Sequence, residues 1–167
     1  ATRESAKQIK NGDFILIDLW CKKKIPRAIY ADIARVAIAA SQPSAKQQEI
    51  FQIVYQAQQK AVEFMTERLS GGLVIKGHEV DDICRNCIIE KGFGPFFTHR
   101  TGHNIDTQVH GAGANLDNLE TSDYRQLLPG MCFSVEPGIY LPGEFGVRLE
   151  TNVVIQPEGS LHITGGF

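Results

Sequence analysis

Acidic side chains stand within or directly after apolar runs at four places in this sequence. Ionised carboxylates are almost never fully buried unless a cation or another polar partner accompanies them. A neighbouring arginine or a backbone N–H group would explain one such residue, but four together favour a metal site. The four residues are Asp18, Asp32, Glu136 and Glu150.

Three of the five histidines, His99, His103 and His110, lie in one short polar segment between these acidic residues. Imidazole and carboxylate groups together are typical ligands of divalent transition metals. A polar loop with incidental histidines is the simpler alternative. The combination of acidic strands and a histidine-rich loop nevertheless favours a metal centre.

The four cysteines suggest no second metal site. Cys84 and Cys87 have C-x-x-C spacing, but no further ligand pair accompanies them, and they fall in a helical pattern. We therefore interpret them as cysteines on a helix face. Free thiols without a disulfide pattern favour a cytoplasmic location.

Length and charge bound the remaining function classes. A chain of 167 residues fits one domain, and its net charge of -2 gives no reason to expect nucleic acid or an anionic membrane as a partner. No apolar run approaches the roughly 18 residues of a membrane-spanning helix.

Two helices are expected to position these residues. Ser44 and Gln47 have the spacing of a capping box, apolar residues recur at helical spacing over 50–69, and Gly71 provides a stop. A second helix is predicted over 78–91.

Short apolar runs between turn signals predict antiparallel strands around these helices, which indicates the α+β class. Residues 111–129 form a long polar loop, and such loops inside compact domains are usually functional. The expected strands or extended segments cover 14–20, 28–39, 93–99, 131–136, 145–155 and 161–164.

Three ordered motifs then carry a family resemblance. They are His99-Arg-Thr-Gly-His103, Ser134-Val-Glu136-Pro-Gly-Ile-Tyr140 and Gly146-Val-Arg148-Leu-Glu150. Together they resemble the metallopeptidases with the pita-bread fold, which include methionine aminopeptidase, Xaa-Pro aminopeptidase and Xaa-Pro dipeptidase. The resemblance covers 13–164 and is closest to the proline-specific branch. It implies a curved antiparallel sheet with helices on its outer face.

The resemblance also implies two divalent metal ions. Asp18 would bind one ion with both oxygens, Asp32 and Glu150 would bridge the two ions, and His103 and Glu136 would complete the other. Manganese or cobalt is the metal that the family most often implies, while iron and zinc also suit these ligands.

The implied reaction is hydrolysis of the Xaa-Pro bond at peptide N-termini by metal-activated water. Glu136 would take and return the proton, and His110 would support the tetrahedral intermediate. His99 and Arg148 would hold substrate or orient the ligands. A creatinase-like hydrolase and a non-enzymatic peptide-binding module of the same fold remain alternatives, and aminopeptidase and dipeptidase are not distinguished.

The sequence departs from the family pattern near His103. Asn104 and Asp106 replace glycines, and Gly111 follows His110 where the family usually has glutamate. These changes put substrate fit in doubt more than metal binding. Because the family's domain normally begins well before the first ligand aspartate, we expect residues 1–167 to be a partial catalytic domain that lacks an upstream segment. A free sheet edge would allow pairing with a second copy.

Overall fold

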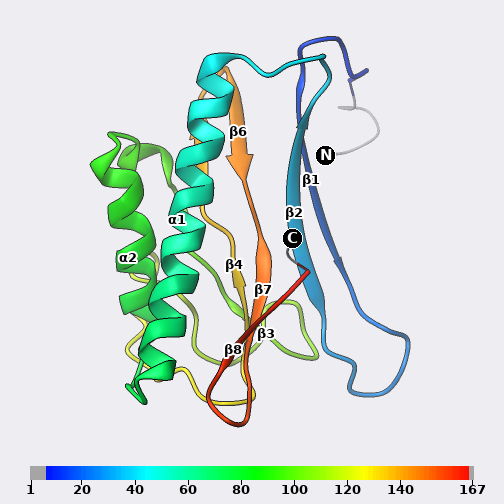
Figure 1. Cartoon of the computed structure of the whole chain (residues 1–167). Coiled ribbons are helices and arrows are strands. Elements are labelled where there is room, and N and C mark those ends of the chain that lie inside the picture. The colour runs from blue at the N-terminus through cyan, green and yellow to red at the C-terminus, as the bar shows by residue number, and fades with distance from the viewer. Residues whose placement is uncertain (1–6, 166–167) are drawn as a thin grey trace.

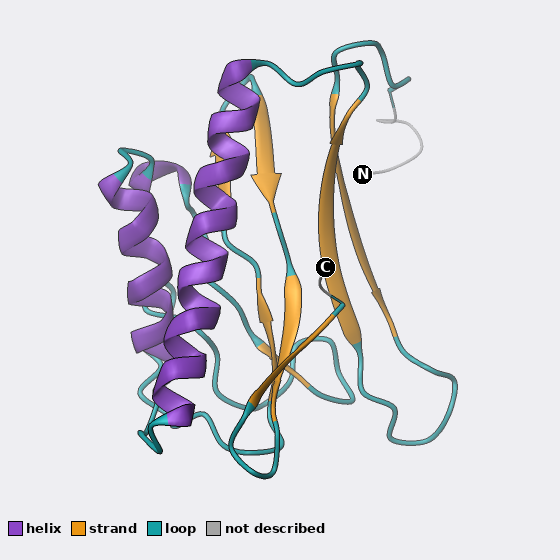
Figure 2. Ribbon diagram, in the orientation of Figure 1, coloured by secondary structure: helices purple, strands orange, loops and turns teal. Residues whose placement is uncertain are grey.

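The computed structural model describes residues 7–165 and contains two long helices among short antiparallel strands. The helices are α1 (Ala45–Ser70) and α2 (Gly77–Glu90), followed by the 3-10 turn η2 (Gly94–Phe96). Figure 2 shows that extended loops join many of the strands. The strands are β1 (Phe14–Cys21), β2 (Ala31–Ile38), β3 (Asn104–Ile105), β4 (Cys132–Val135), β5 (Gly138–Leu141), β6 (Phe145–Arg148), β7 (Thr151–Ile155) and β8 (Leu161–Thr164).

Helix α1 begins at the predicted capping box. The backbone N–H of Gln47 donates to Ser44 Oγ (3.2 Å), and the backbone N–H of Ser44 donates to Gln47 Oε1 (2.8 Å). Both bonds satisfy N–H groups that the first helical turn leaves unpaired. The helix ends at Gly71, whose N–H donates to the carbonyl of Glu67 (3.0 Å). Its buried apolar face contains Ile50, Ile53, Val54, Ala57, Ala61, Val62 and Met65.

The strands form three antiparallel sheets with the orders β1-β2, β3-β4-β7-β8 and β5-β6, which confirms the α+β class. In Figure 1, α1 and α2 form one layer, the β1–β2 hairpin lies on the opposite side, and β4, β6 and β7 lie between them. No helix of residues 7–165 has the length and apolar character that crossing a membrane requires.

The structure corrects three strand predictions. The predicted strand over 145–155 is interrupted at Leu149 and Glu150, because β6 pairs with β5 whereas β7 pairs with β4. The segment 93–99 is not simply extended, since Gly94–Phe96 forms a 3-10 turn with Pro95 in its first positions. Strand β5, which begins at Gly138 directly after Pro137, was not among the expected strands.

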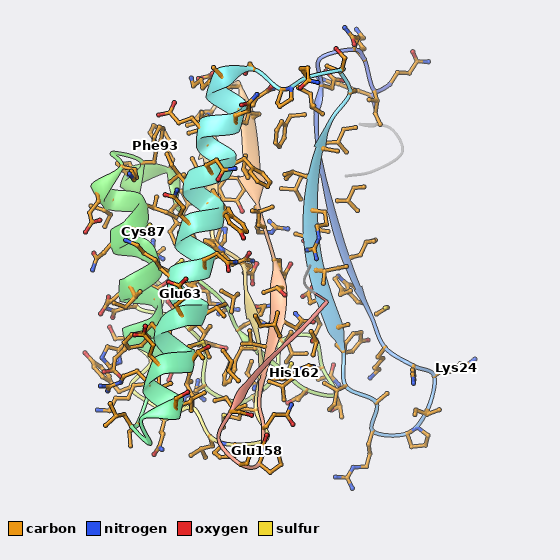
Figure 3. The ribbon with its side chains drawn as sticks, in the orientation of Figure 1. Lys24, Glu63, Cys87, Phe93, Glu158 and His162 are labelled. Atoms are coloured by element: carbon orange, nitrogen blue, oxygen red, sulfur yellow. The ribbon has the colours of Figure 1, made fainter. Side chains whose placement is uncertain are left out.

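The core lies between the helical layer and the middle strands. Met65 of α1 and Ile88 of α2 are fully buried, as are Phe133, Val147 and Val153 from β4, β6 and β7. Side chains fill the space between these layers in Figure 3, where Cys87 lies on α2 and Lys24 lies at the far end of the β1–β2 loop. A packed core of this kind holds the middle strands rigidly and fixes the direction of the side chains at their ends.

Candidate metal centre

Three of the predicted ligands meet in the structure, although they come from distant parts of the sequence. One ligand atom from each of Asp32, His103 and Glu150 lies within 4.8 Å of the others, and all three residues are buried. Asp32 is on β2, His103 directly precedes β3, and Glu150 directly precedes β7. Two carboxylates and one imidazole at this separation can hold a divalent cation.

Glu136 adjoins this cluster from the end of β4. Its Oε1 lies 3.3 Å from Nε2 of His103, while Oδ2 of Asp32 lies 3.6 Å from the same nitrogen. The hydroxyl of Ser134 donates to Glu136 Oε1 (3.0 Å) and accepts the backbone N–H of His103 (3.0 Å). Ser134 therefore orients both predicted ligands at once.

The imidazole of His103 is oriented by the backbone. Its Nδ1 lies 3.1 Å from the carbonyl oxygen of Asn104, and because a carbonyl only accepts, Nδ1 carries the proton. Nε2 is thus directed toward the carboxylates, which is the arrangement usual for a metal-binding histidine.

Asp18 lies on the same face of the hairpin as Asp32. In the antiparallel register Asp18 pairs with Ala34 and Trp20 pairs with Asp32, so the two aspartates are diagonal neighbours. The carboxylate of Asp18 is 42% exposed and forms an ion pair with Arg148. Asp18 therefore faces the site but lies outside the group of three ligands that meet within 4.8 Å.

Arg148 contacts two carboxylates of the site that are distant from it or on another strand. Although it precedes Glu150 by only two residues, its guanidinium pairs with Asp18 and its Nε lies 3.8 Å from Glu136 Oε2. The cause is the break between β6, which ends at Arg148, and β7, which begins after Glu150.

Buried acidic groups in this cluster resist ionisation. Burial is the main cause that raises the pKa of Glu150 to about 9, and the charges of Glu136, Asp32 and Asp18 add to the effect. Burial also raises the pKa of Glu136, although His103 opposes this change. Oδ1 of Asp32 and Oε1 of Glu150 are buried without a hydrogen-bond partner in the described chain. Buried oxygens that lack donors, and carboxylates that lack countercharge, fit a bound metal ion.

Two buried amide side chains position the predicted ligands, and neither amide was expected from the sequence. Asn152 on β7 accepts the backbone N–H of Asp32 (2.9 Å) and donates to its carbonyl (2.6 Å), which joins β2 to β7. Gln58 of α1 donates to the carbonyls of Val135 (2.9 Å) and Leu149 (3.1 Å), the residues before Glu136 and Glu150. The available signal was an amide within an otherwise apolar strand or helix face.

A second group of side chains borders the centre. Nε2 of His99 lies 2.7 Å from the hydroxyl of Tyr140, which also accepts from Arg148 Nη1 (3.3 Å). A Cβ atom at Gly138 or Gly146 would lie 2.6 Å or 2.7 Å from atoms of the Tyr140 side chain. The glycines of the last two motifs therefore leave room for this aromatic ring.

The predicted catalytic residues share one cavity of about 170 Å³, which His103 also lines. His110 is exposed, and its ring is perpendicular to that of His103 with centroids 4.4 Å apart. A larger cavity of about 310 Å³ lies between β2 and α1, but none of its lining side chains is titratable. The lining of the smaller cavity is His99, Arg100, His103, His110, Glu120, Glu136 and Arg148.

Most of this chain matches a known protein family. Residues 1–157 match the model of metallopeptidase family M24. This chain belongs to family M24. An Xaa-Pro dipeptidase from Pyrococcus horikoshii is 38% identical over 160 residues, which cover 96% of this chain and 42% of the relative.

Solved structures of the family have the same fold. A prolidase from Pyrococcus furiosus is 31% identical with a TM-score of 0.77, over 98% of this chain and 44% of that one. A dipeptidase, PepE, from Mycobacterium ulcerans is 28% identical with a TM-score of 0.84, over 98% and 40%. These likenesses confirm the pita-bread fold. This M24 chain spans less than half the length of the curated relatives and solved structures that it matches.

Proposed function

We propose that this M24 chain carries the active site of a dinuclear-metal peptidase that hydrolyses the Xaa-Pro bond at peptide N-termini. The observation that carries the proposal is the meeting of Asp32, His103 and Glu150 within 4.8 Å, with Glu136 at 3.3 Å from His103. The relatives named as Xaa-Pro dipeptidase and prolidase support the choice of peptide substrates with proline at the second position.

Five side chains would hold the two ions: Asp18, Asp32, His103, Glu136 and Glu150. When bound, the divalent cations supply Lewis acidity, which lowers the pKa of water and polarises the scissile carbonyl. The negative charge of the four carboxylates also requires balancing positive charge. Within the described part of the site, Arg148 is the main side chain that provides it. Oxygen-rich ligands with one imidazole suit manganese, which is the metal we propose.

Glu136 is the proton carrier in this proposal. Burial raises the pKa of its carboxyl group, which favours a carboxylate able to accept a proton and return it. The hydroxyl of Ser134 holds Oε1, so only limited rotation of the carboxylate is available. Glu136 also lines the cavity, where a peptide would meet it.

The histidines have separate proposed roles. His110 is exposed beside His103 and would donate to the oxygen that gains charge during attack on the carbonyl. His99 and Arg148 meet at the hydroxyl of Tyr140 and would form the wall that orients the substrate. Burial lowers the pKa of His99, which favours its neutral form at physiological pH.

Metal analysis and peptide hydrolysis test the proposal. The full-length protein is incubated with manganese, and bound metal is measured beside cleavage of Xaa-Pro, Xaa-Pro-Xaa and Met-Ala-Xaa peptides. Two ions per chain and cleavage of the proline peptides are expected. Cleavage of Met-Ala-Xaa alone would overturn the proline specificity. Absence of bound metal would favour a peptide-binding module, and metal without cleavage of any of the peptides would overturn the peptidase proposal. A cytoplasmic location and a homo-oligomer stay predictions.

A further inference from the structure

Asn104 is buried beside the metal centre, and its side-chain amide connects three segments. Its Nδ2 donates to the carbonyl of Cys132 on β4 (3.1 Å), and its Oδ1 accepts the N–H of Gly113 (3.0 Å). Its own backbone N–H donates to the side-chain oxygen of Asn115 (3.1 Å). A buried amide that is hydrogen-bonded through both its nitrogen and its oxygen fixes the relative position of the segments that it joins.

The carbonyl of Asn104 connects the two histidines of the site. It lies 3.1 Å from Nδ1 of His103 and accepts the N–H of Gly111 (2.7 Å), the residue after His110. The structure gives no hydrogen bond to the exposed ring of His110 from any residue within 7–165. The contact with the ring of His103 and the backbone around His110 therefore set where the ring lies. Asn104 holds that backbone at Gly111 through its carbonyl and at Gly113 through its side chain.

The space around Asn104 requires glycine on the facing segment. A Cβ atom at Gly111 would lie 2.2 Å from Oδ1 of Asn104 and 2.8 Å from Oδ2 of Asp106. A Cβ atom at Gly113 would lie 2.6 Å from Cγ of Asn104. Each of these distances is shorter than a real contact, so a side chain at 111 or 113 would displace Asn104.

We propose that Asn104 is a positioning residue that holds His110 against His103, and that its side chain makes glycine necessary at position 111. Asn104 and Gly111 are then one coupled pair, because the side chain of Asn104 occupies the space that a side chain at 111 would need. The catalytic consequence rests on the proposed function, whereas the coupling of the two positions does not.

A double-mutant cycle on the metal-free full-length protein tests the coupling. The variants are Asn104→Gly, Gly111→Ala and their combination, and the measurement is the Tm. With Asn104 present, Gly111→Ala is expected to lower the Tm by about 5 °C or more, because the added methyl group overpacks the site. In the Asn104→Gly background, the same substitution at position 111 is expected to lower the Tm by less than about half as much, because only the contact with Oδ2 of Asp106 remains.

Every outcome of the cycle decides the coupling. If Gly111→Ala alone fails to fold while the double variant folds, the proposal is supported, since removal of the amide rescues the chain. An equal loss of Tm in both backgrounds, or failure of both to fold, overturns it. Hydrogen exchange gives a second measurement: Asn104→Gly is expected to speed exchange of the Gly113 amide at least about tenfold.

Activity with manganese and an Xaa-Pro peptide tests the effect on His110. Asn104→Gly is expected to lower kcat about ten- to a hundredfold with little change in KM, because a group that acts in the transition state is displaced. Asn118→Gly is the matched control, since it removes a loop amide bonded to Asp82 (2.7 Å) instead. An unchanged kcat in Asn104→Gly overturns the positioning role. Absence of activity in the unaltered protein contradicts the proposed function alone, and the cycle and exchange then decide the inference.

Discussion

Replacing Glu150 with glutamine is expected to change how the stability of the metal-free protein depends on pH. Burial, together with the charges of Glu136, Asp32 and Asp18, raises the pKa of Glu150 from 4.5 to about 9. The folded protein therefore keeps a proton that the unfolded chain releases. The contribution of this carboxyl group to the free energy of unfolding is therefore fully present below pH 4.5. It is lost progressively as the pH rises toward 9. Glutamine has no such proton and removes this dependence.

The folded protein binds one more proton than the unfolded chain, and this difference sets the size of the pH effect on the free energy of unfolding. The free energy of unfolding of the unaltered protein is expected to fall, relative to Glu150→Gln, by up to about 1.4 kcal/mol per pH unit. Between about pH 5 and pH 8 the difference reaches about 4 kcal/mol as an upper value, because neighbouring carboxylates share the proton. Urea unfolding in a chelator at several pH values within this range measures it.

A matched control separates the site from a general effect of charge. Glu63 is exposed on α1, where Figure 3 labels it on the helical layer, and Glu63→Gln is expected to keep the pH dependence of the unaltered protein. Manganese is expected to stabilise the unaltered protein at about pH 8 by about 2.7 kcal/mol at a hundred times its Kd, and Glu150→Gln much less. Parallel pH curves for the unaltered protein and Glu150→Gln would refute the reasoning.

Three further predictions concern buried side chains. Asn152→Ala is expected to lower the free energy of unfolding by about 2–4 kcal/mol, because two backbone groups of Asp32 lose their partners. The same change is expected to lower metal affinity at least about tenfold, and unchanged affinity in a metal titration would contradict this prediction. Gln58→Leu is expected to cost about 2–3 kcal/mol in urea unfolding, since two buried carbonyls lose a donor; an unaltered midpoint would argue against that role. A thiol reagent is expected to label exposed Cys21 in the native protein but not Cys84, whose pKa burial raises to about 12; rapid modification of Cys84, seen by mass spectrometry, would disprove its burial.

Local signals were sufficient for the helices. The capping box of Ser44 and Gln47 and the stop at Gly71 depend on neighbours only a few residues away, and the structure confirms each of them. Helix α2 begins at Gly77, one residue before the prediction, and ends at Glu90. The periodicity of a helix is visible in sequence because its buried face repeats within a few residues.

Strand boundaries could not be predicted in the same way. Apolar residues recur across 145–155, but β6 and β7 pair with different neighbours, so the strand is interrupted at Leu149 and Glu150. The choice of partner strand depends on residues that are distant in sequence, and no local pattern contains it. The same break turns Arg148 toward Asp18 and Glu136 instead of Glu150.

Residue types alone indicated the chemistry of the site. Carboxylates beside apolar runs and a histidine-rich loop predicted a metal centre, and their motifs predicted a family that the comparison confirms. Tertiary structure decided which of these groups meet. Pairing of β3, β4 and β7, and the Asn152 bridge from β7 to β2, bring Asp32, His103 and Glu150 together, whereas Asp18 stays partly exposed beside Arg148. The physical reason is that ligand type is a property of one residue, while ligand distance depends on hydrogen bonds between strands far apart in the chain.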